Sequence, residues 1–220
     1  MFLGHFGVAL AAKKLESKTS LGTLFFAAQF ADLTWPIFLL LGWEKVQIEP
    51  GNTRVTPLNF SSYPISHSFL TEIGFGIALG LIYYALRRKN QGASRAAFVL
   101  AACVPSHWVL DWVVHRPDLP LTPWSRTFHG LDLWRSLPIT VTLEFLIYGI
   151  GIALYLGQTK PKDGIGRYAF WVLIIFLAIV WLASIFGPPP PNTRVLAFSA
   201  LAMWLTIPWS AWADRHRILN

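Results

Sequence analysis

The sequence predicts an all-α, polytopic membrane helical bundle of about six transmembrane helices plus a short N-terminal helix. Of its 220 residues, 54% are hydrophobic and only 13% are charged, which is about half the charged fraction of an ordinary soluble domain. Long blocks carry no charge, and they lack the alternating polarity of transmembrane β-strands. A disordered chain is therefore excluded and a soluble domain disfavoured, whereas helices can satisfy their own backbone groups in lipid.

The expected spans are stretches of about 20 mostly apolar residues, the length that a helix needs to cross a bilayer. They cover residues 20–42, 66–86, 96–115, 137–158, 168–187 and 195–213. The last two are the most uniformly apolar. We expect a single integral membrane domain over residues 1–220. Within it, residues 1–158 carry the polar-site helices and outer loops, and residues 159–220 form two apolar scaffold helices.

The first segment, residues 2–12, is apolar but too short to span a bilayer. It precedes a pair of lysines, which is the reverse of the order in a secretory signal. Two arrangements stay open: an interfacial helix, or a short helix that forms a hairpin with residues 20–42. In the hairpin, His5 and Asp32 lie on neighbouring helices, at depths that differ by about one turn.

Basic residues set the expected orientation. Most of them fall before the first span, between the second and third, between the fourth and fifth, and at the chain end. By the positive-inside rule these segments are cytoplasmic, so loops 43–65 and 116–136 face the outer side. The formal net charge of +7 is then a topology signal facing anionic lipid, and no nucleic-acid partner is expected. The single Cys103 excludes an internal disulfide.

Ionisable side chains within the spans are the main functional signal, because they are costly in lipid and usually face a cavity or a partner. The last two spans contain none. The remaining spans and the first segment contain His5, Asp32, His67, Glu72, His107, Asp111, His115 and Glu144. We interpret them as one polar pocket built by the N-terminal two thirds of the chain.

The sharpest motif places His107, Asp111 and His115 four residues apart. On a helix this spacing puts the three side chains on one face, where an imidazole and a carboxylate can bind one metal ion or orient each other. The structural alternative is a buried His–Asp pair that only holds helices together. Three such groups inside a bilayer, with further histidines in the chain, favour a functional site. Pro105 is expected to kink this helix where it lines a cavity.

Other segments supply further groups. Asp32 lies deep in a span, where a carboxylate needs a proton or a cation. His67 is expected in the first turn of the second span. In the outer loop, Arg116 and Arg126 can bind phosphate or lipid headgroups, or act as ordinary interfacial arginines. Loop 43–65 is long enough to cover the pocket as a lid.

Five short motifs occur in the first part of the chain. They are Gly4-His5-Phe6-Gly7, Asp32 before Trp35-Pro36, His67-Ser68, Ser106-His107 with Asp111, and the run His115–Leu121 with Leu133–Pro138. Together they resemble the YdjM-like family of multipass bacterial inner-membrane proteins, which are assigned as metal-dependent hydrolases. The resemblance covers most of residues 1–158. It implies an inner (cytoplasmic) membrane location and the metal ligands His5, Asp32, His67, His107 and Asp111.

The expected function is a membrane-embedded hydrolase that acts on a phosphoester or lipid-like substrate, with membrane lipid as its partner. A divalent ion, zinc in the first instance given the histidine and carboxylate ligands, lowers the pKa of a bound water to near neutrality. Glu72 or His115 serves as general base in this hypothesis, and Arg116 or Arg126 stabilises developing charge.

Two alternatives stay open. One is a proton- or ion-coupled transporter whose buried acids and histidines relay protons or bind an ion. The other is a non-catalytic membrane scaffold with a structural polar cluster. The chain has no Walker loop, dinucleotide fingerprint, HExxH motif or GxSxG elbow, so the corresponding enzyme classes are not indicated.

Overall fold

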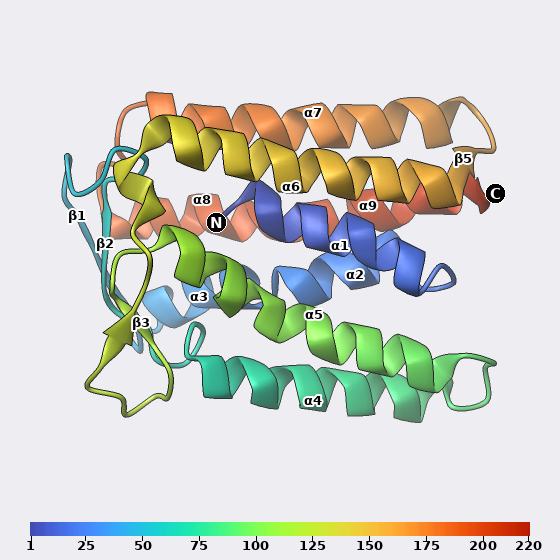
Figure 1. Cartoon of the computed structure of the whole chain (residues 1–220), viewed down its shortest axis with the longest axis horizontal. Helices are drawn as coiled ribbons and strands as arrows, with labels where there is room; N and C mark the ends of the chain where they lie inside the picture. Colours follow the sequence, from blue (N-terminus) through green and yellow to red (C-terminus); the bar gives the residue numbers. More distant parts are fainter.

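The computed structural model describes residues 1–220 and shows an all-α bundle whose helices run along one long axis (Figure 1). Its helices are α1 (Leu3–Leu15), α2 (Leu21–Ala28), α3 (Phe30–Leu40), α4 (Phe69–Arg87), α5 (Ala93–Val114), α6 (Leu137–Gln158), α7 (Gly164–Phe186), α8 (Thr193–Leu201) and α9 (Thr206–Arg215).

Five segments are long and apolar enough to cross a membrane: α4, α5, α6, α7 and the segment Thr193–Arg215, which joins α8 to α9 through the 3₁₀ turn η2 (Ala202–Leu205). The pair α2 and α3 is a sixth apolar segment, bent by 57°. The prediction of a multipass membrane bundle with about six spans and a short N-terminal helix is confirmed.

Several helices begin at capping side chains. Ser20, Ser68, Asp163 and Asn192 accept hydrogen bonds from backbone N–H groups three residues later, at the starts of α2, α4, α7 and α8. Because Ser68 is the cap, α4 begins at Phe69. His67 therefore lies in the turn before α4, and the prediction that it occupies the first turn of that helix is wrong.

Three small antiparallel sheets, which the sequence analysis did not predict, join the connecting segments. They are β1 (Lys45–Ile48) with β2 (Leu58–Ser62), β3 (Leu119–Pro120) with β4 (Phe128–His129), and β5 (Thr159–Pro161) with β6 (Arg217–Leu219). The pairing satisfies backbone groups of the connections. Residues 43–65 and 116–136 form a folded layer at one end of the bundle, which we call the loop cap and which includes the 3₁₀ turn η1 (Leu133–Arg135) (Figure 1).

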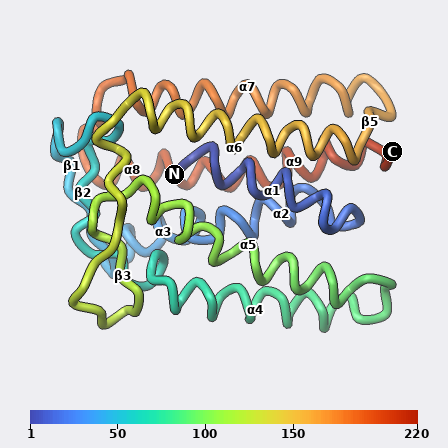
Figure 2. Tube along the Cα trace, in the orientation of Figure 1, coloured from blue at the N-terminus to red at the C-terminus, as the bar shows by residue number.

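The N-terminal helix α1 lies inside the bundle, packed along α6 and paired with α2 (Figure 2). Leu3, Phe6 and Leu10 are completely buried. The hairpin between the first segment and residues 20–42 is therefore present, and the interfacial alternative is excluded. Because protein surrounds α1, it does not need the length of a membrane span.

Two glycines let α1 approach α6 closely. A Cβ atom added to Gly151 would overlap the carbonyl oxygen of Gly7, and one added to Gly7 would lie 2.7 Å from the carbonyl oxygen of Ile147. By contrast, a Cβ added to Gly149 on the same helix would meet no atom within 4 Å. The contact at Gly151 thus sets the position of α1, and with it the position of His5.

Gly151→Ala is therefore expected to destabilise the detergent-solubilised protein by about 1–3 kcal/mol, because the extra methyl group forces α1 away from α6. Gly149→Ala is the matched control, and it is expected to be neutral or slightly stabilising because alanine favours a helix. Thermal unfolding followed by circular dichroism measures both. Equal shifts for the two variants would contradict the close contact.

The end of the bundle away from the loop cap is held by a carboxylate whose side chain is only 9% exposed. Asp214 Oδ2 accepts hydrogen bonds from Lys13 Nζ at 2.7 Å and from Leu21 N at 3.0 Å. Asp214 Oδ1 accepts one from the Tyr155 hydroxyl at 2.7 Å. Lys13 Nζ also donates to the Thr19 carbonyl at 2.8 Å. One side chain of α9 thus connects α1, α2 and α6.

Candidate metal centre

Four histidines and two aspartates from distant parts of the chain meet inside the bundle, on the side of the loop cap. They are His5 on α1, Asp32 on α3, His67 in the turn before α4, His107 and Asp111 on α5, and His115 at the end of α5. All are buried except Asp32, whose side chain is 22% exposed. The structure therefore brings together the five ligands expected from the sequence, with His115 beside them.

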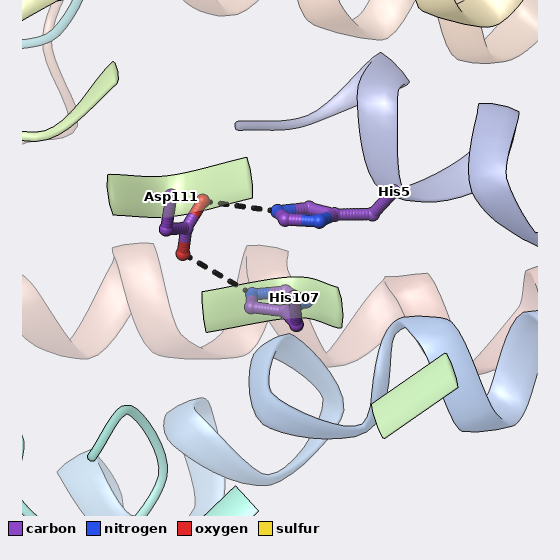
Figure 3. A group of neighbouring side chains, drawn as sticks. All are labelled: His5, His107 and Asp111. Carbon is purple, nitrogen blue, oxygen red and sulfur yellow. Dashed lines mark hydrogen bonds and ion pairs between the residues drawn. The ribbon is translucent and has the colours of Figure 1, made fainter. Parts of the chain in front are cut away.

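Asp111 lies at the centre of this group. Its Oδ1 is 3.1 Å from His5 Nε2, and its Oδ2 is 3.3 Å from His107 Nε2, so the two imidazoles approach the two oxygens of one carboxylate (Figure 3). The same Oδ2 is 3.7 Å from His115 Nε2 and 3.8 Å from His67 Nε2. The rings of His5 and His107 are stacked, with 3.6 Å between their centroids.

Asp32 faces two of the same histidines. Its Oδ1 is 3.5 Å from His67 Nε2 and 3.6 Å from His107 Nε2. The ligand atoms of Asp32, His67 and His107 lie within 4.8 Å of one another, and so do those of His5, His107 and Asp111. Each set can hold a metal ion. Since both share His107, whose Nε2 has one lone pair, the two sets describe one centre around that atom.

Two of these histidines are oriented through their Nδ1 atoms by oxygen acceptors. His107 Nδ1 donates to the Ala28 carbonyl at 2.9 Å, at the bend between α2 and α3. His115 Nδ1 donates to Asp118 Oδ1 at 3.0 Å. A proton on Nδ1 of a neutral imidazole leaves a lone pair on Nε2. In both residues, that Nε2 faces the carboxylates.

A three-residue relay orients His67. The backbone N–H groups of Ile65 and Ser66 both donate to Glu44 Oε1 at 2.8 Å, which fixes this carboxylate. Ser66 Oγ then donates to Glu44 Oε2 at 2.7 Å. Because the hydroxyl proton is used there, Ser66 Oγ accepts the hydrogen bond from His67 Nδ1 at 2.6 Å. His67 Nε2 is again left with a lone pair.

With neutral imidazoles, this arrangement places three Nε2 lone pairs opposite two carboxylates. The Nε2–oxygen distances of 3.3–3.8 Å exceed those of charge-assisted hydrogen bonds, and His107 Nε2 has no hydrogen-bond partner. Lone pairs and buried carboxylates repel each other unless a cation lies between them. The Met1 ammonium group, which is ion-paired with Asp111, supplies one such charge, and the two ligand sets around His107 can hold a metal ion as another.

Tyr63 and Trp134 complete the surroundings of His115. The Tyr63 hydroxyl donates to Asp118 Oδ1 at 2.6 Å, and the Trp134 ring lies 4.0 Å from the His115 ring. Burial, followed by the charge of Asp118, raises the pKa of the Tyr63 hydroxyl, which therefore stays a donor. Burial lowers the pKa of His115 below its ordinary value. The imidazole is thus neutral near pH 7.

Three other residues expected at the site do not line its cavity. Glu72 is buried on α4, where its Oε2 accepts a hydrogen bond from Trp108 N at 3.1 Å. Arg116 is held by Asn52 at 2.6 Å and Asn59 at 2.7 Å, within the loop cap. Arg126 is an exposed residue of the same cap. None of the three faces the cavity described next.

A cavity of about 520 Å³ opens onto the centre. Asp32, His67, Asp111 and His115 line it, together with Val55–Leu58 and Phe60 of the loop cap. Loop 43–65 therefore covers the site, as the sequence analysis expected. Residues 159–220, expected only as a scaffold, also contribute to the cavity wall. Their contribution is Trp181, Ser184, Pro188–Pro191, Val195, Leu196, Ser199, Ala200 and Met203.

The residues that orient the histidines were not predicted from the sequence. Asp118 could have been found, because it lies three residues after His115. Glu44 and Ser66 could not, because the path of loop 43–65 brings them together.

Ser66→Ala is expected to weaken zinc affinity by about 10- to 100-fold, as losses of such partners do. Competition with a chromophoric chelator measures the affinity, and Ser61→Ala, at an exposed position of strand β2, is the control. Equal affinity in Ser66→Ala and the unmodified protein would contradict the relay.

Comparison with known proteins finds no match, since no family model, no curated protein and no solved structure is significantly similar to the chain. The resemblance to the YdjM-like family stays a prediction from the motifs.

Proposed function

We propose that this protein is a membrane-embedded, metal-dependent hydrolase that cleaves an ester or phosphoester bond of a lipid-like substrate. The observation that carries the proposal is the buried set of Nε2 atoms and carboxylates around His107, which opens into a cavity. The distribution of basic residues and the motif resemblance support a bacterial inner-membrane location. Membrane lipid is then both the solvent and the source of substrate.

The proposed ligands are His5, Asp32, His67, His107 and Asp111. Imidazole nitrogens and carboxylate oxygens are the ligands of zinc sites, and catalytic zinc usually keeps one position open. The ligand set fits such an ion because His107 Nε2 is otherwise an orphaned buried atom. When bound, a divalent ion supplies an attacking water whose pKa lies near 7.

His115 is the proposed general base. It lines the cavity, and its Nδ1 is held by Asp118 at 3.0 Å. His115 Nε2 can take the proton of the attacking water, while the Asp118 carboxylate stabilises the imidazolium that results. Glu72, the other base expected from the sequence, does not line the cavity, so no proton transfer is assigned to it.

The arrangement supports a hydrolase over the transporter alternative. A carrier needs a route for its ion on both sides of the membrane. The polar cluster lies beside the loop cap, whereas at the other end Lys13 and Tyr155 both donate hydrogen bonds to Asp214. We therefore place the chemistry at one membrane face.

The test is metal analysis of the purified protein, combined with a screen of lipid esters and phosphoesters. We expect about one zinc ion per chain, and turnover that a chelator removes and zinc restores. His115→Gln is expected to keep the ion and lose about 100-fold or more in kcat. Failure to bind any divalent ion after reconstitution would refute the proposal. A bound ion without turnover would instead indicate the structural scaffold.

A further inference from the structure

The cavity over the centre lacks fixed cations from its side chains. No lysine or arginine lines it, whereas Asp32, Asp111 and Glu144 do. The one cationic group beside it is the Met1 amino group, which is ion-paired with Asp111. A divalent ion at the centre offsets two of the three carboxylates. The surroundings of the reacting bond are therefore close to neutral or negative.

The lysine and arginine side chains near this end of the molecule contact other residues or line another cavity. Arg116 is bonded to Asn52 and Asn59. Lys45 and Arg194 line a separate cavity of about 480 Å³. Sites that transfer phosphoryl groups usually clamp the phosphate oxygens with arginine, lysine or several metal ions. The absence of such side chains favours a substrate whose reacting group is uncharged.

Trp35 supplies a donor for an uncharged carbonyl. It lines the cavity, and it is buried, with only 6% of its surface exposed. Its indole Nε1 has no hydrogen-bond partner. By contrast, the indole N–H groups of Trp108, Trp204 and Trp209 each donate to a backbone carbonyl. Leaving a buried donor unpaired is costly, which makes this N–H a candidate donor to a ligand in the cavity.

Trp35 lies on the same helix as Asp32, one of the proposed metal ligands. Trp35 follows Asp32 by three residues on α3, so both side chains lie on one face of that helix. The Trp35 ring lies 5.5 Å from the Phe60 ring of the loop cap. The N–H donor and a proposed metal ligand are thus neighbours on the same wall.

The remaining walls suit an acyl chain. They include Trp181, Val195, Leu196 and Met203 from the segments around α7 and α8, together with Pro188–Pro191 between these helices. A cavity of about 520 Å³ is the size that holds one small ligand. It can take a carbonyl group with part of one chain, while the rest of the chain extends outside.

We propose that the substrate is a neutral, single-chain amphiphile with a carboxylic ester bond, whose carbonyl oxygen accepts a hydrogen bond from Trp35 Nε1. This inference rests on the proposed hydrolase function. Water oxygen bonds to the carbonyl carbon, negative charge develops on the carbonyl oxygen beside Trp35, and the C–O bond to the alcohol breaks. One water proton passes through His115 to the leaving alkoxide, and the products are an alcohol and a carboxylic acid, which ionises in water.

Photolabelling tests the substrate class without requiring turnover. A monoacylglycerol and a lysophosphatidic acid that carry the same diazirine acyl chain serve as probes, and mass spectrometry locates the labelled peptides. We expect the neutral probe to label residues 181–203 at a concentration at least about 10-fold lower than the anionic probe needs. Ala200→Trp fills the cavity and is expected to abolish this labelling, whereas Ile175→Trp, on a lipid-facing position of α7, should preserve it. Equal or stronger labelling by lysophosphatidic acid would overturn the proposal.

Hydrolysis separates this inference from the proposed function. With zinc-loaded protein, we expect greater acceleration over the uncatalysed rate for 4-nitrophenyl octanoate than for bis(4-nitrophenyl) phosphate. Trp35→Phe keeps an aromatic side chain, smaller than the indole, but removes the donor, and it is expected to lower kcat on the octanoate about 100-fold, with a smaller change in KM. Trp209→Phe, whose N–H bonds to Ala169, is the control. Preferred cleavage of the phosphate would overturn the ester proposal alone, and absence of both metal and turnover would refute the hydrolase.

Discussion

Replacing His107 with glutamine is expected to lower zinc affinity by more than about 100-fold. The loss of a residue that merely orients a ligand costs about 10- to 100-fold, and His107 is itself the ligand common to both possible ligand sets. Glutamine keeps much of the side-chain volume, but its amide is a poor substitute for an imidazole lone pair. Hydrolytic activity should disappear together with the metal.

Thermal unfolding gives a readout that does not depend on activity. An ion that binds only the folded protein, at 100 times its dissociation constant, stabilises it by about 2.7 kcal/mol. Zinc should therefore raise the melting temperature of the unmodified protein and have little effect on His107→Gln. His216→Gln is the matched control, because His216 pairs with Asp163 at 2.8 Å at the other end of the bundle.

A structural role for the cluster predicts the opposite pattern. If His107 only holds helices together, chelators leave the melting temperature of the unmodified protein unchanged, and His107→Gln destabilises the metal-free protein. An equal response of the variant and the unmodified protein to zinc would exclude His107 as a ligand. The experiment thus compares the metal centre directly with its structural alternative.

The spans could be predicted from the sequence because hydropathy alone decides which segments can lie in lipid. The placement of α1 could not be decided this way. With 13 residues it is too short for a span, and its position depends on the close approach of Gly7 and Gly151, which no pattern within one segment reveals. The same contact determines that His5 reaches Asp111.

The part of the candidate site that consists of ionisable side chains could be predicted, because such side chains are energetically unfavourable in a membrane. Asp32, His107 and Asp111 attract attention because ionisable groups rarely lie in spans. The other parts of the site depend on loop paths and on uncharged side chains. Glu44 lies just outside a span, and the indole of Trp35 looks like an interfacial anchor until the structure shows its unpartnered N–H.

The largest effect on folding is expected from Asp214→Asn. The side chain of Lys13 is only 5% exposed, and the substitution leaves its ammonium group without a counter-charge. Breaking one partner of a buried ion pair typically costs about 3–5 kcal/mol. The amide can replace at most part of the hydrogen bonding to Leu21 and Tyr155. Unfolding in detergent should show a large fall in the melting temperature.

Two further variants separate charge from shape. Asp163→Asn makes the same chemical change on an exposed carboxylate that caps α7, and its effect should be much smaller, since asparagine also caps helices. Adding Lys13→Met to Asp214→Asn removes the uncompensated charge and should restore part of the lost stability. If the double variant is less stable than Asp214→Asn alone, the hydrogen bonds of Lys13 matter more than its charge. Because this network lies far from His107, zinc affinity should persist in every variant that folds.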